Sequence, residues 1–382
     1  MSDDGVSGDR GAPAGTGPSQ VFGIERRERI MDEVRRNGSV VVRELAVILG
    51  VTELTIRRDI TALADLGLVT RVHGGATARS SLDQTVARSA DAAGPARYRI
   101  GMVVPSLSYY WPQIVNGARA TAALSRSQLV LRGSSYDPAD QRRQMAALVE
   151  TGGIHGLIAA PDTAGQDGYA LLAWLDALPI PVVLAERRAP SSLALRSLEW
   201  VTTDHEFGAV LAVRHLYEQG HRRIGIAAAR HSPTSDHLRR GWARASADLG
   251  LDTGLTVNAE IDDVENGARD ARLGALVDEC LATGTTALFV HADPQAILLE
   301  HHCLDRGVRI PEDLAIVAYD DEVAENGEPP ITALRPPKQH IGRMAVETMV
   351  ARLSEGRRRP TQRTQVLPEL QVRASSLTAP SA

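Results

Sequence analysis

A series of short apolar runs, which begins at Tyr98, constrains the fold of this chain most strongly. The runs are RIGMVVP, LVLRGS, GLIAAP, IPVVLAE, RIGIAAA, TALFVHA and LAIVAYDD, and stretches of helical character separate them. Continuous Val, Ile, Leu and Ala runs between helices are typical of parallel strands that are buried on both faces. The pattern continues over more residues than one sheet accommodates, so we expect an α/β fold with two lobes.

The residues before these runs divide into three segments. Residues 1–20 are mainly Gly, Pro, Ser, Ala and Asp, have almost nothing to bury, and are expected to be disordered. Residues 21–78 carry helical periodicity and predict a small compact domain. Residues 79–97 are polar and small, which is typical of a linker, and residues 377–382 form a second tail.

The compact domain has the pattern of a DNA-binding helix-turn-helix. ERRERIMDEVRRNG predicts a first helix that Gly38 ends, and VRELAVILG predicts a second helix followed by a tight turn at Gly50. Thr52 can cap a third helix, TELTIRRDITALADLG, which begins with hydroxyl and basic residues. LGLVTRVHGGA follows, and its short strand and Gly-Gly tip fit a wing. This order of helix, short turn and helix indicates a reader of double-stranded DNA.

The third helix has one apolar and one polar face. Ile56, Ile60 and Leu63 recur at i, i+4 and i+7 and are expected in the core. Arg57 and Arg58 suit phosphates or a guanine edge, and the alternative is a merely solvated helix face. The whole chain has a net charge of −5, whereas residues 21–79 hold ten Arg and eight acidic residues, so a nucleic-acid site must be local.

These motifs resemble the DeoR-type winged helix-turn-helix over roughly residues 24–77, and TIRRDI and RVHGGA are the most specific parts. The resemblance implies a DNA operator as partner and places residues 52–59 in the major groove. It also implies that Asp59 orients an Arg and does not touch DNA. The DNA-contacting residues that it predicts are Thr52, Glu53, Thr55, Arg57, Arg58, Arg71, His73 and Gly74.

A cluster of aromatic residues follows the first apolar run, in VVPSLSYYWPQIVNGARATAAL. A loop between a parallel strand and the next helix lies at the carboxyl edge of the sheet, where open α/β sheets bind ligands. Tyr109, Tyr110 and Trp111 are consecutive there, although aromatic residues make up only 4% of the chain. Their flat faces suit stacking on a sugar or a base. The alternative is that one or two of them pack beneath the loop.

From about Tyr98 to Ser376 the chain resembles the core of the LacI/GalR regulators, which has the fold of periplasmic sugar-binding proteins. The strongest points are RIGMVVPSLS, QRRQMAALVETGGIHGLIAAP, VTTDHEFGAVLAVRHLYEQGHRRIGIAA and PELQVRASS. The resemblance implies a two-lobed periplasmic-binding-protein-like core with parallel sheets, a homodimer, and a small-molecule effector, a sugar or sugar derivative, between the lobes. It implies chain crossings near residues 202, 322 and 357, with an N-lobe of about 98–202 plus 323–356 and a C-lobe of about 203–322 plus 357–376.

The resemblance also implies effector-binding positions. Tyr109, Tyr110 and Trp111 fall on the stacking loop of the family, Asp293 falls on its ligand-binding Asp, and Arg187 matches a further position. A carboxylate at Asp293 can accept two hydroxyl hydrogen bonds, and an N-cap of the following helix is an alternative that can coexist. Asp204 matches a family position as well, and we interpret it as the N-cap of HEFGAVLAVRHL.

This chain departs from the family pattern at three points, of which the first two leave the effector open and the third concerns the DNA minor groove. Leu238 stands where the family usually has an Arg, three residues before the pair Gly241-Trp242, and Arg239 substitutes for it after a shift of one residue. NAEIDDVENG lacks the aromatic residue that the family often has there. QTVARSADA, in the linker, lacks the Leu that wedges into the minor groove. A nucleoside or another non-sugar effector therefore remains an alternative.

Other functional classes have little support. No P-loop, HExxH, Gly-x-Ser-x-Gly or dinucleotide-binding motif occurs, so we expect no enzyme, no cofactor and no metal site. Cys280 and Cys303 are too few for a disulfide framework or a structural zinc site and are expected to be thiols in a reducing compartment. The N-terminus has no apolar signal region, and no apolar run reaches the ~18 residues of a membrane helix, which predicts a cytoplasmic protein without a membrane partner.

Together these patterns predict a ligand-responsive DNA-binding transcriptional regulator, a repressor of carbohydrate uptake or catabolism genes. Two alternatives remain at this point. One is a small-molecule binding protein without specific DNA recognition, and the other is an enzyme of carbohydrate metabolism.

Overall fold

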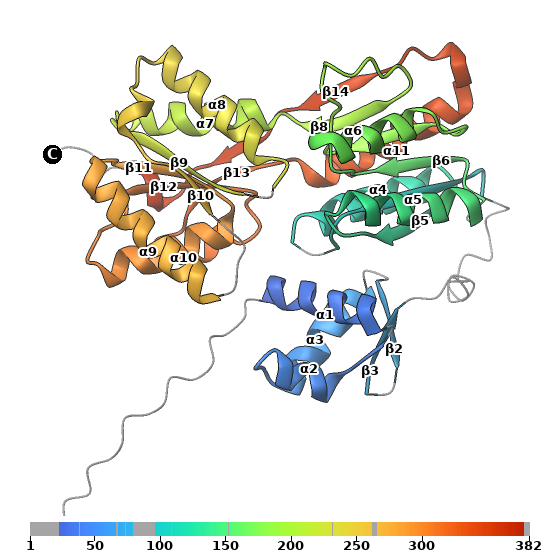
Figure 1. The fold of residues 1–382 in the computed structure, drawn as a ribbon, viewed down its shortest axis with the longest axis horizontal. Helices are drawn as coiled ribbons and strands as arrows, with labels where there is room; N and C mark the ends of the chain where they lie inside the picture. The colour runs from blue at the N-terminus through green and yellow to red at the C-terminus, as the bar shows by residue number, and fades with distance from the viewer. Residues whose placement is uncertain are drawn as a thin grey trace, which may run out of the picture. The chain divides into compact units, whose positions relative to one another are not determined.

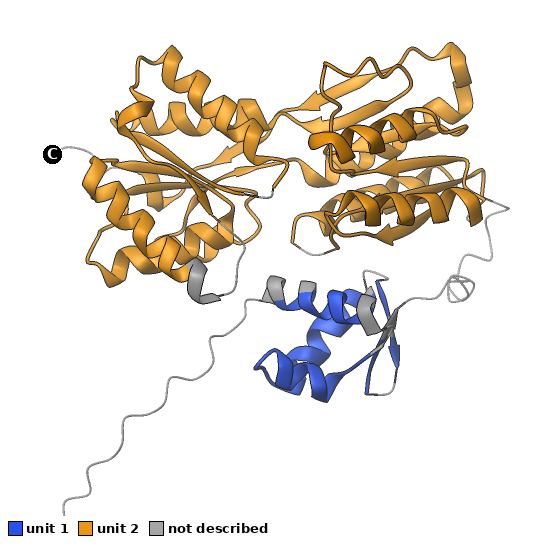
Figure 2. Cartoon of the chain, in the orientation of Figure 1, with its two compact units in different colours: residues 1–89 blue, residues 90–382 orange. Residues whose placement is uncertain are grey.

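A computed structural model describes residues 23–37, 39–65, 68–72, 74–78, 96–107, 109–151, 153–230, 232–261 and 266–377. The chain forms two compact units, residues 1–89 and residues 90–382 (Figure 2). The expected N-terminal tail and residues 79–95 of the expected linker lie outside the described residues, as do residues 378–382. Within the described ranges, no helix is both long enough and apolar enough to cross a membrane.

The first unit contains three helices and a small antiparallel sheet (Figure 1). The order β1-β3-β2 makes the hairpin of β2 and β3 the wing. Gly75 lies on β3 so close to β1 that a Cβ atom would stand 2.0 Å from the carbonyl oxygen of Val40, and only glycine fits there. The elements are α1 (Gly23–Asn37), β1 (Ser39–Val41), α2 (Val42–Ile48), α3 (Glu53–Asp65), β2 (Val69–Val72) and β3 (Gly75–Ala78).

The core of this unit confirms the predicted faces of the helices. Ile56, Ile60 and Leu63 on α3 are buried. The amide of Thr55 donates to Oγ1 of Thr52 over 3.3 Å, which is the predicted N-terminal cap of α3. Gly50, between α2 and α3, has a φ of 62°, a conformation that glycine adopts without steric cost.

The second unit consists of two lobes, each built on a six-stranded sheet with helices on both faces (Figure 1). The N-lobe sheet has the order β14-β8-β7-β6-β4-β5, and its strands are parallel. Its elements are β4 (Tyr98–Val104), α4 (Trp111–Leu124), β5 (Ser127–Gly133), α5 (Pro138–Thr151), β6 (Gly156–Ala159), α6 (Gly165–Asp176), β7 (Val182–Ala185), β8 (Glu199–Thr203), α11 (Lys338–Glu355) and β14 (Arg363–Val366).

The C-lobe sheet has the order β10-β9-β11-β12-β13-β15, and only β15 runs antiparallel to its neighbour. Apolar side chains on both faces of this sheet form the core of the lobe. Its elements are α7 (His205–Glu218), β9 (Ile224–Ala229), α8 (Ser235–Asp248), β10 (Asn258–Ile261), α9 (Asn266–Thr283), β11 (Ala287–His291), α10 (Asp293–Asp305), β12 (Ala315–Tyr319), β13 (Thr332–Arg335) and β15 (Glu369–Gln371).

The chain passes between the lobes three times, and two of the expected positions are wrong. The first crossing joins β8 to α7, beside the expected residue 202. The second follows β13, not residue 322, because β13 pairs with β12 in the C-lobe sheet. The third lies between β14 and β15, not near residue 357, because β14 pairs with β8 and β15 pairs with β13. These strands are too short and too polar to stand out as apolar runs.

Helix α11 belongs to the N-lobe because it packs closely against α4. A Cβ atom on Gly342 would stand 1.9 Å from the carbonyl oxygen of Ile114, and one on Gly117 would stand 2.0 Å from that of Gln339. Glycines at both points let the two helix backbones touch. The contact fixes the start of α11, and with it Lys338, at the cleft between the lobes.

Candidate functional site

The outer side of α3 carries the predicted DNA-contacting residues. Arg57 and Arg58 are exposed, and an ion pair of 3.2 Å joins Arg57 to Glu53 one turn earlier. Both partners of this pair are about half exposed, so the pair adds little stability and Arg57 can leave it at small cost. Leu54 is 62% exposed on the same side, and sequence reasoning missed it. Its spacing of three and four residues from the two arginines is the signal that could have found it.

Three other residues of the predicted α3 stretch have structural contacts. Thr52 caps α3, and its hydroxyl lies 2.9 Å from that of Thr55, which is half-buried. Asp59 is buried and accepts hydrogen bonds from Arg26 over 2.5 Å and from Arg27 over 3.0 Å. Asp59 therefore orients two arginines of α1, which agrees with the expectation that it orients an Arg.

The wing presents two of the three residues predicted on it. Arg71 on β2 is exposed. Gly74 is also exposed and forms the turn to β3 with a φ of 79°, which glycine favours. His73 lies outside the described residues. DNA contact by the described wing residues stays a prediction.

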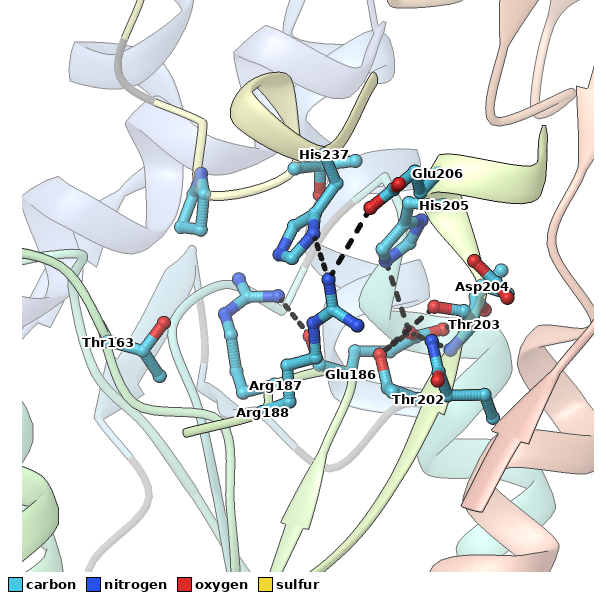
Figure 3. Close-up of a pocket in the computed structure, with 13 residues that line it drawn as sticks. Thr163, Glu186, Arg187, Arg188, Thr202, Thr203, Asp204, His205, Glu206 and His237 are labelled. Carbon is cyan, nitrogen blue, oxygen red and sulfur yellow. Dashed lines mark hydrogen bonds and ion pairs between the residues drawn. The ribbon is translucent and has the colours of Figure 1, made fainter. Parts of the chain in front are cut away.

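The second candidate site is a cleft between the two lobes of the core (Figure 3). The N-lobe contributes the ends of β7, β8 and β14, and the C-lobe contributes the starts of α7 and α8. The space left between the lining side chains is about 10 Å³, room for about one water molecule, and contacts such as that of Arg188 with His237 join the two lobes across it. The lining residues are Thr163, Glu186, Arg187, Arg188, Thr202, Thr203, Asp204, His205, Glu206, Pro233, Thr234, His237 and Gln365.

Glu186 is the buried carboxylate at the base of the cleft, and sequence reasoning missed it. One oxygen accepts from the hydroxyls of Tyr110 over 2.8 Å and Thr203 over 2.7 Å, and the other accepts from the amide of Thr203 over 2.8 Å. Burial raises the pKa of Glu186, but the hydrogen bond and charge of His205 and the donors of Thr203 outweigh it, so the pKa is lowered to about 2. Glu186 also has a φ of 55°, a strained conformation typical of functional sites.

Arg187, predicted to bind the effector, lies in the cleft. Its Nη1 donates to the carbonyl oxygen of Glu186 over 2.7 Å, and its guanidinium carbon lies 5.4 Å from the ring centre of Trp111. Only 8% of the residue is exposed, and Nε is buried without a hydrogen-bond partner among the described residues. A ligand can therefore pair with Nε, and effector binding by Arg187 stays a prediction.

His237 on α8 joins the lobes and was missed by sequence reasoning. Its Nδ1 lies 2.9 Å from Nη2 of Arg188 in the N-lobe (Figure 3). The same Nδ1 lies 2.6 Å from Nη2 of Arg240 in the C-lobe. Burial, followed by the charges of His205 and the neighbouring arginines, lowers the pKa of His237 to about 3. His237 is therefore neutral at pH 7 and accepts hydrogen bonds from both guanidinium groups.

The three predicted aromatic residues have different surroundings. Trp111 opens α4 and is 2% exposed, so it packs beneath the loop, which was the alternative to stacking on a ligand. Tyr110 packs edge-on against Trp111, with ring centres 5.9 Å apart, and its hydroxyl holds Glu186. Tyr109 has a φ of 56°, and burial, followed by the charges of Asp293 and Asp320, raises its pKa well above 10.

Asp293 has a different set of partners from the one expected. It is fully buried at the start of α10, and its two oxygens accept the backbone amides of residues 321–323. Burial, followed by the charge of Asp320, outweighs the opposing effect of the three amides and raises its pKa to about 7. Asp293 thus holds the loop after β12, in which Asp320 and Asp321 have φ values of 100° and 52°. Hydroxyl binding by Asp293 stays a prediction.

Lys338, the single lysine of the chain, connects that loop to the N-lobe. Its Nζ pairs with Glu322 over 2.6 Å, donates to the carbonyl oxygen of Asp320, and lies 5.2 Å from the ring centre of Tyr110. Gln113 on α4 also donates to Glu322, over 3.0 and 3.1 Å. Contacts between polar groups therefore hold the lobes together on this side of the cleft as well.

The expected replacement of the family Arg by Arg239 does not agree with the structure. Arg239 donates to Asn258 and to the carbonyl oxygen of Ala259 on β10, and it does not line the cleft. Leu238 is fully buried in the core of the C-lobe. Asp204 is the N-cap of α7, as predicted, and accepts from the amide of Phe207 over 3.0 Å.

Each of the two units of the chain contains a match to a known protein family. Residues 26–82 match the DeoR-like helix-turn-helix domain, and residues 213–376 match the periplasmic binding protein-like domain. The regulator DegA of Bacillus subtilis is 26% identical over 282 residues, which are 72% of this chain and 80% of DegA. The repressor CytR of Escherichia coli K12 is 29% identical over 248 residues, 64% of this chain and 70% of CytR.

Solved structures of similar fold are also transcription regulators. A LacI family regulatory protein from Chloroflexus aggregans superposes with a TM-score of 0.61 at 24% identity and covers 73% of this chain and 98% of its own. The regulator CelR in complex with cellobiose superposes with a TM-score of 0.61 at 22% identity, over 88% of this chain and 99% of CelR. At these identities the likeness concerns the fold, which is a two-lobed α/β architecture of the periplasmic-binding-protein type.

Proposed function

We propose that this chain, in which a DeoR-like helix-turn-helix domain is joined to a LacI-type periplasmic binding protein-like core, is a ligand-responsive repressor of transcription. The observation that carries the proposal is the pairing of two units in one chain. One unit presents an exposed basic helix, and the other has a polar cleft between two lobes. The relatives DegA, a transcriptional regulator, and CytR, a transcriptional repressor, support the same function.

The DNA-reading element is α3. Its outer face offers two arginine side chains for phosphates or guanine edges and one apolar side chain, Leu54, for a thymine methyl group. The core resembles that of the LacI/GalR regulators, and this resemblance implies a homodimer. We therefore expect the active form to be a homodimer that reads a two-fold operator. We expect the genes that it represses to serve carbohydrate uptake or catabolism.

The effector binds between the lobes. A ligand changes DNA affinity only if it binds two conformations with different affinities, typically by ~1–3 kcal/mol. The cleft supplies the basis for two conformations, because its closed form depends on a few polar contacts between the lobes, such as that of Arg188 with His237. A sugar or sugar derivative is the ligand class that we propose, and a nucleoside or another non-sugar ligand is the alternative.

Selection of genomic fragments by the purified chain tests the proposal. We expect an inverted-repeat sequence beside sugar-transport or glycosidase genes, bound at physiological salt. Substitution of Arg57 and Arg58 by Ala is expected to weaken operator binding by at least roughly 30-fold, since each base-reading arginine contributes about 1–3 kcal/mol. Substitution of Arg142 and Arg143, on α5 of the core, by Ala is the matched control.

Two outcomes would contradict the proposal. Recovery of fragments without a shared motif, abolished by modest salt, would mean charge-driven binding without specificity. Unchanged operator affinity of the α3 variant, with an unchanged circular dichroism spectrum, would remove α3 from the DNA interface.

A further inference from the structure

Guanidinium groups from both lobes converge on one neutral imidazole in the cleft. Arg188 extends from the end of β7 in the N-lobe, and Arg240 extends from α8 in the C-lobe. Both donate to the same Nδ1 atom of His237, over 2.9 and 2.6 Å. A guanidinium has no acceptor, and an imidazole nitrogen has one lone pair, so two cations share a single neutral acceptor.

Three arginines at this point share one carboxylate, while Glu186 and Asp204 are the other acidic residues that line the cleft. Among the described residues, Glu206 is the carboxylate that pairs with this group of arginines, and it lies 3.8 Å from Arg188, 3.7 Å from Arg240 and 4.0 Å from Arg244. These distances are those of loose ion pairs and exceed hydrogen-bond length. Three guanidinium groups therefore share one carboxylate at the mouth of the cleft.

Arg187 adds a fourth guanidinium, and one edge of it has no partner. Its Nη1 and its flat face are occupied by Glu186 and Trp111. Its Nε is buried without a hydrogen bond to any described residue. Glu186, the acidic side chain beside it, already accepts from Tyr110 and Thr203. The cleft thus has spare donors next to carboxylates whose oxygens are occupied.

We propose that the cluster of Arg187, Arg188, His237 and Arg240 binds an anionic group of the effector, a carboxylate or a phosphate. This inference rests on the proposed function, because it names the ligand class of the same cleft. An anion offers several lone pairs to a bidentate guanidinium edge, whereas His237 offers one. The cluster spans both lobes, so a bound anion removes the repulsion between Arg188 and Arg240 and stabilises the closed form.

The enclosed space of about 10 Å³ means that the lobes must separate before a ligand enters. When the lobes close on a bound anion, the guanidinium groups of Arg188 and Arg240 donate to the anion in place of His237. A neutral sugar cannot do this, because its hydroxyl oxygens are weaker acceptors than a carboxylate or a phosphate. We therefore expect the acid form of a sugar to bind and its neutral form to bind much more weakly.

The test is thermal unfolding of the full chain with sodium phosphate, sodium gluconate or D-glucose, against sodium chloride at equal ionic strength. We expect phosphate, gluconate or both to raise the unfolding temperature in a saturable manner, and D-glucose to leave it unchanged. The two salts separate the two sources of the anion. No stabilisation by either anion, or equal stabilisation by D-glucose, would overturn the inference.

Variants locate the site. Arg188→Gln and Arg187→Gln are expected to weaken the stabilising anion by roughly 10- to 100-fold, as the loss of a charge-assisted hydrogen bond does. Arg143→Gln, on the exposed side of α5, is the matched control and is expected to leave the affinity unchanged. Equal affinity of the three variants would mean adventitious binding elsewhere and would refute the inference.

The same proteins are used for the selection of genomic fragments. Specific operator recovery without anion binding would refute the ligand class and leave the proposed function intact. Loss of specific recovery in the unsubstituted chain would refute the proposed function itself.

Discussion

Replacing Glu186 by Gln should destabilise the core unit by about 3 kcal/mol at pH 7. The substitution keeps the shape of the side chain but removes its charge and one of its two acceptor oxygens. Burial alone raises the pKa of Glu186. His205 and the donors of Thr203 lower it more strongly, from an ordinary 4.5 to about 2. Each pH unit of lowered pKa corresponds to about 1.4 kcal/mol in favour of the charged folded form.

The pH dependence of this effect has a definite sign. A carboxyl group whose pKa is lower in the folded than in the unfolded chain stabilises the fold fully above pH 4.5 and loses that effect as the pH falls toward 2. The stability difference between the unsubstituted chain and Glu186→Gln should therefore be constant from pH 8 to about pH 5. Below pH 4.5 it should shrink by about 1.4 kcal/mol for each pH unit.

Urea unfolding followed by tryptophan fluorescence measures this difference. Trp111, Trp174, Trp200 and Trp242 are the four tryptophans of the chain, and all of them belong to the core unit, so the signal reports that unit alone. Glu150→Gln, on the exposed side of α5, is the control and should shift the midpoint by less than about 0.5 kcal/mol. A loss below about 1 kcal/mol for Glu186→Gln, or a difference that grows toward low pH, would refute the reasoning.

Two further predictions concern packing. Gly342→Ala should lower the stability of the core unit by about 1–3 kcal/mol or more, because the new Cβ atom would stand 1.9 Å from the carbonyl oxygen of Ile114. An unchanged urea midpoint would contradict the close contact of α4 and α11. Asp59→Asn should remove the carboxylate that Arg26 and Arg27 share. Hydrogen exchange should then become faster across α1 and α3 but not in the core unit. Unchanged exchange would contradict a role for Asp59 in joining the two helices.

The sequence predicts much of this fold because apolar periodicity reports burial directly. The seven apolar runs from Tyr98 onward coincide with β4, β5, β6, β7, β9, β11 and β12, and all of these except the edge strand β5 lie inside their sheets. The strands β13, β14 and β15 have three or four residues each and lie toward the sheet edges, where polar side chains are tolerated. Their positions determine where the chain changes lobes, so the two later crossings could not be placed from the pattern.

The candidate cleft could be predicted only in part, because its key contacts join residues that are far apart in sequence. Glu186 becomes a buried hub only when Tyr110 and Thr203 converge on it, from the loop before α4 and from the end of β8. Asp293 has a family position that suggests a ligand contact, yet three backbone amides of the loop after β12 already occupy it. Neither set of partners leaves a local pattern in the sequence.

The helical repeat explains why His237, and not Arg239, lies in the cleft. Successive residues of a helix are about 100° apart, so residues 237 and 240 share a side of α8, whereas residue 239 is turned away by about 200° from residue 237. Leu238 then lies toward the core, and Arg239 lies toward β10. A one-residue shift toward Arg239 therefore moves the charge out of the cleft. His237, which precedes Leu238, instead places a neutral hydrogen-bond acceptor in the cleft, and Arg188 from the N-lobe donates to it. The departure of this chain from the family pattern thus places the positive charge of the C-lobe two residues further along α8, at Arg240 beside His237, and favours a ligand that carries its own negative charge.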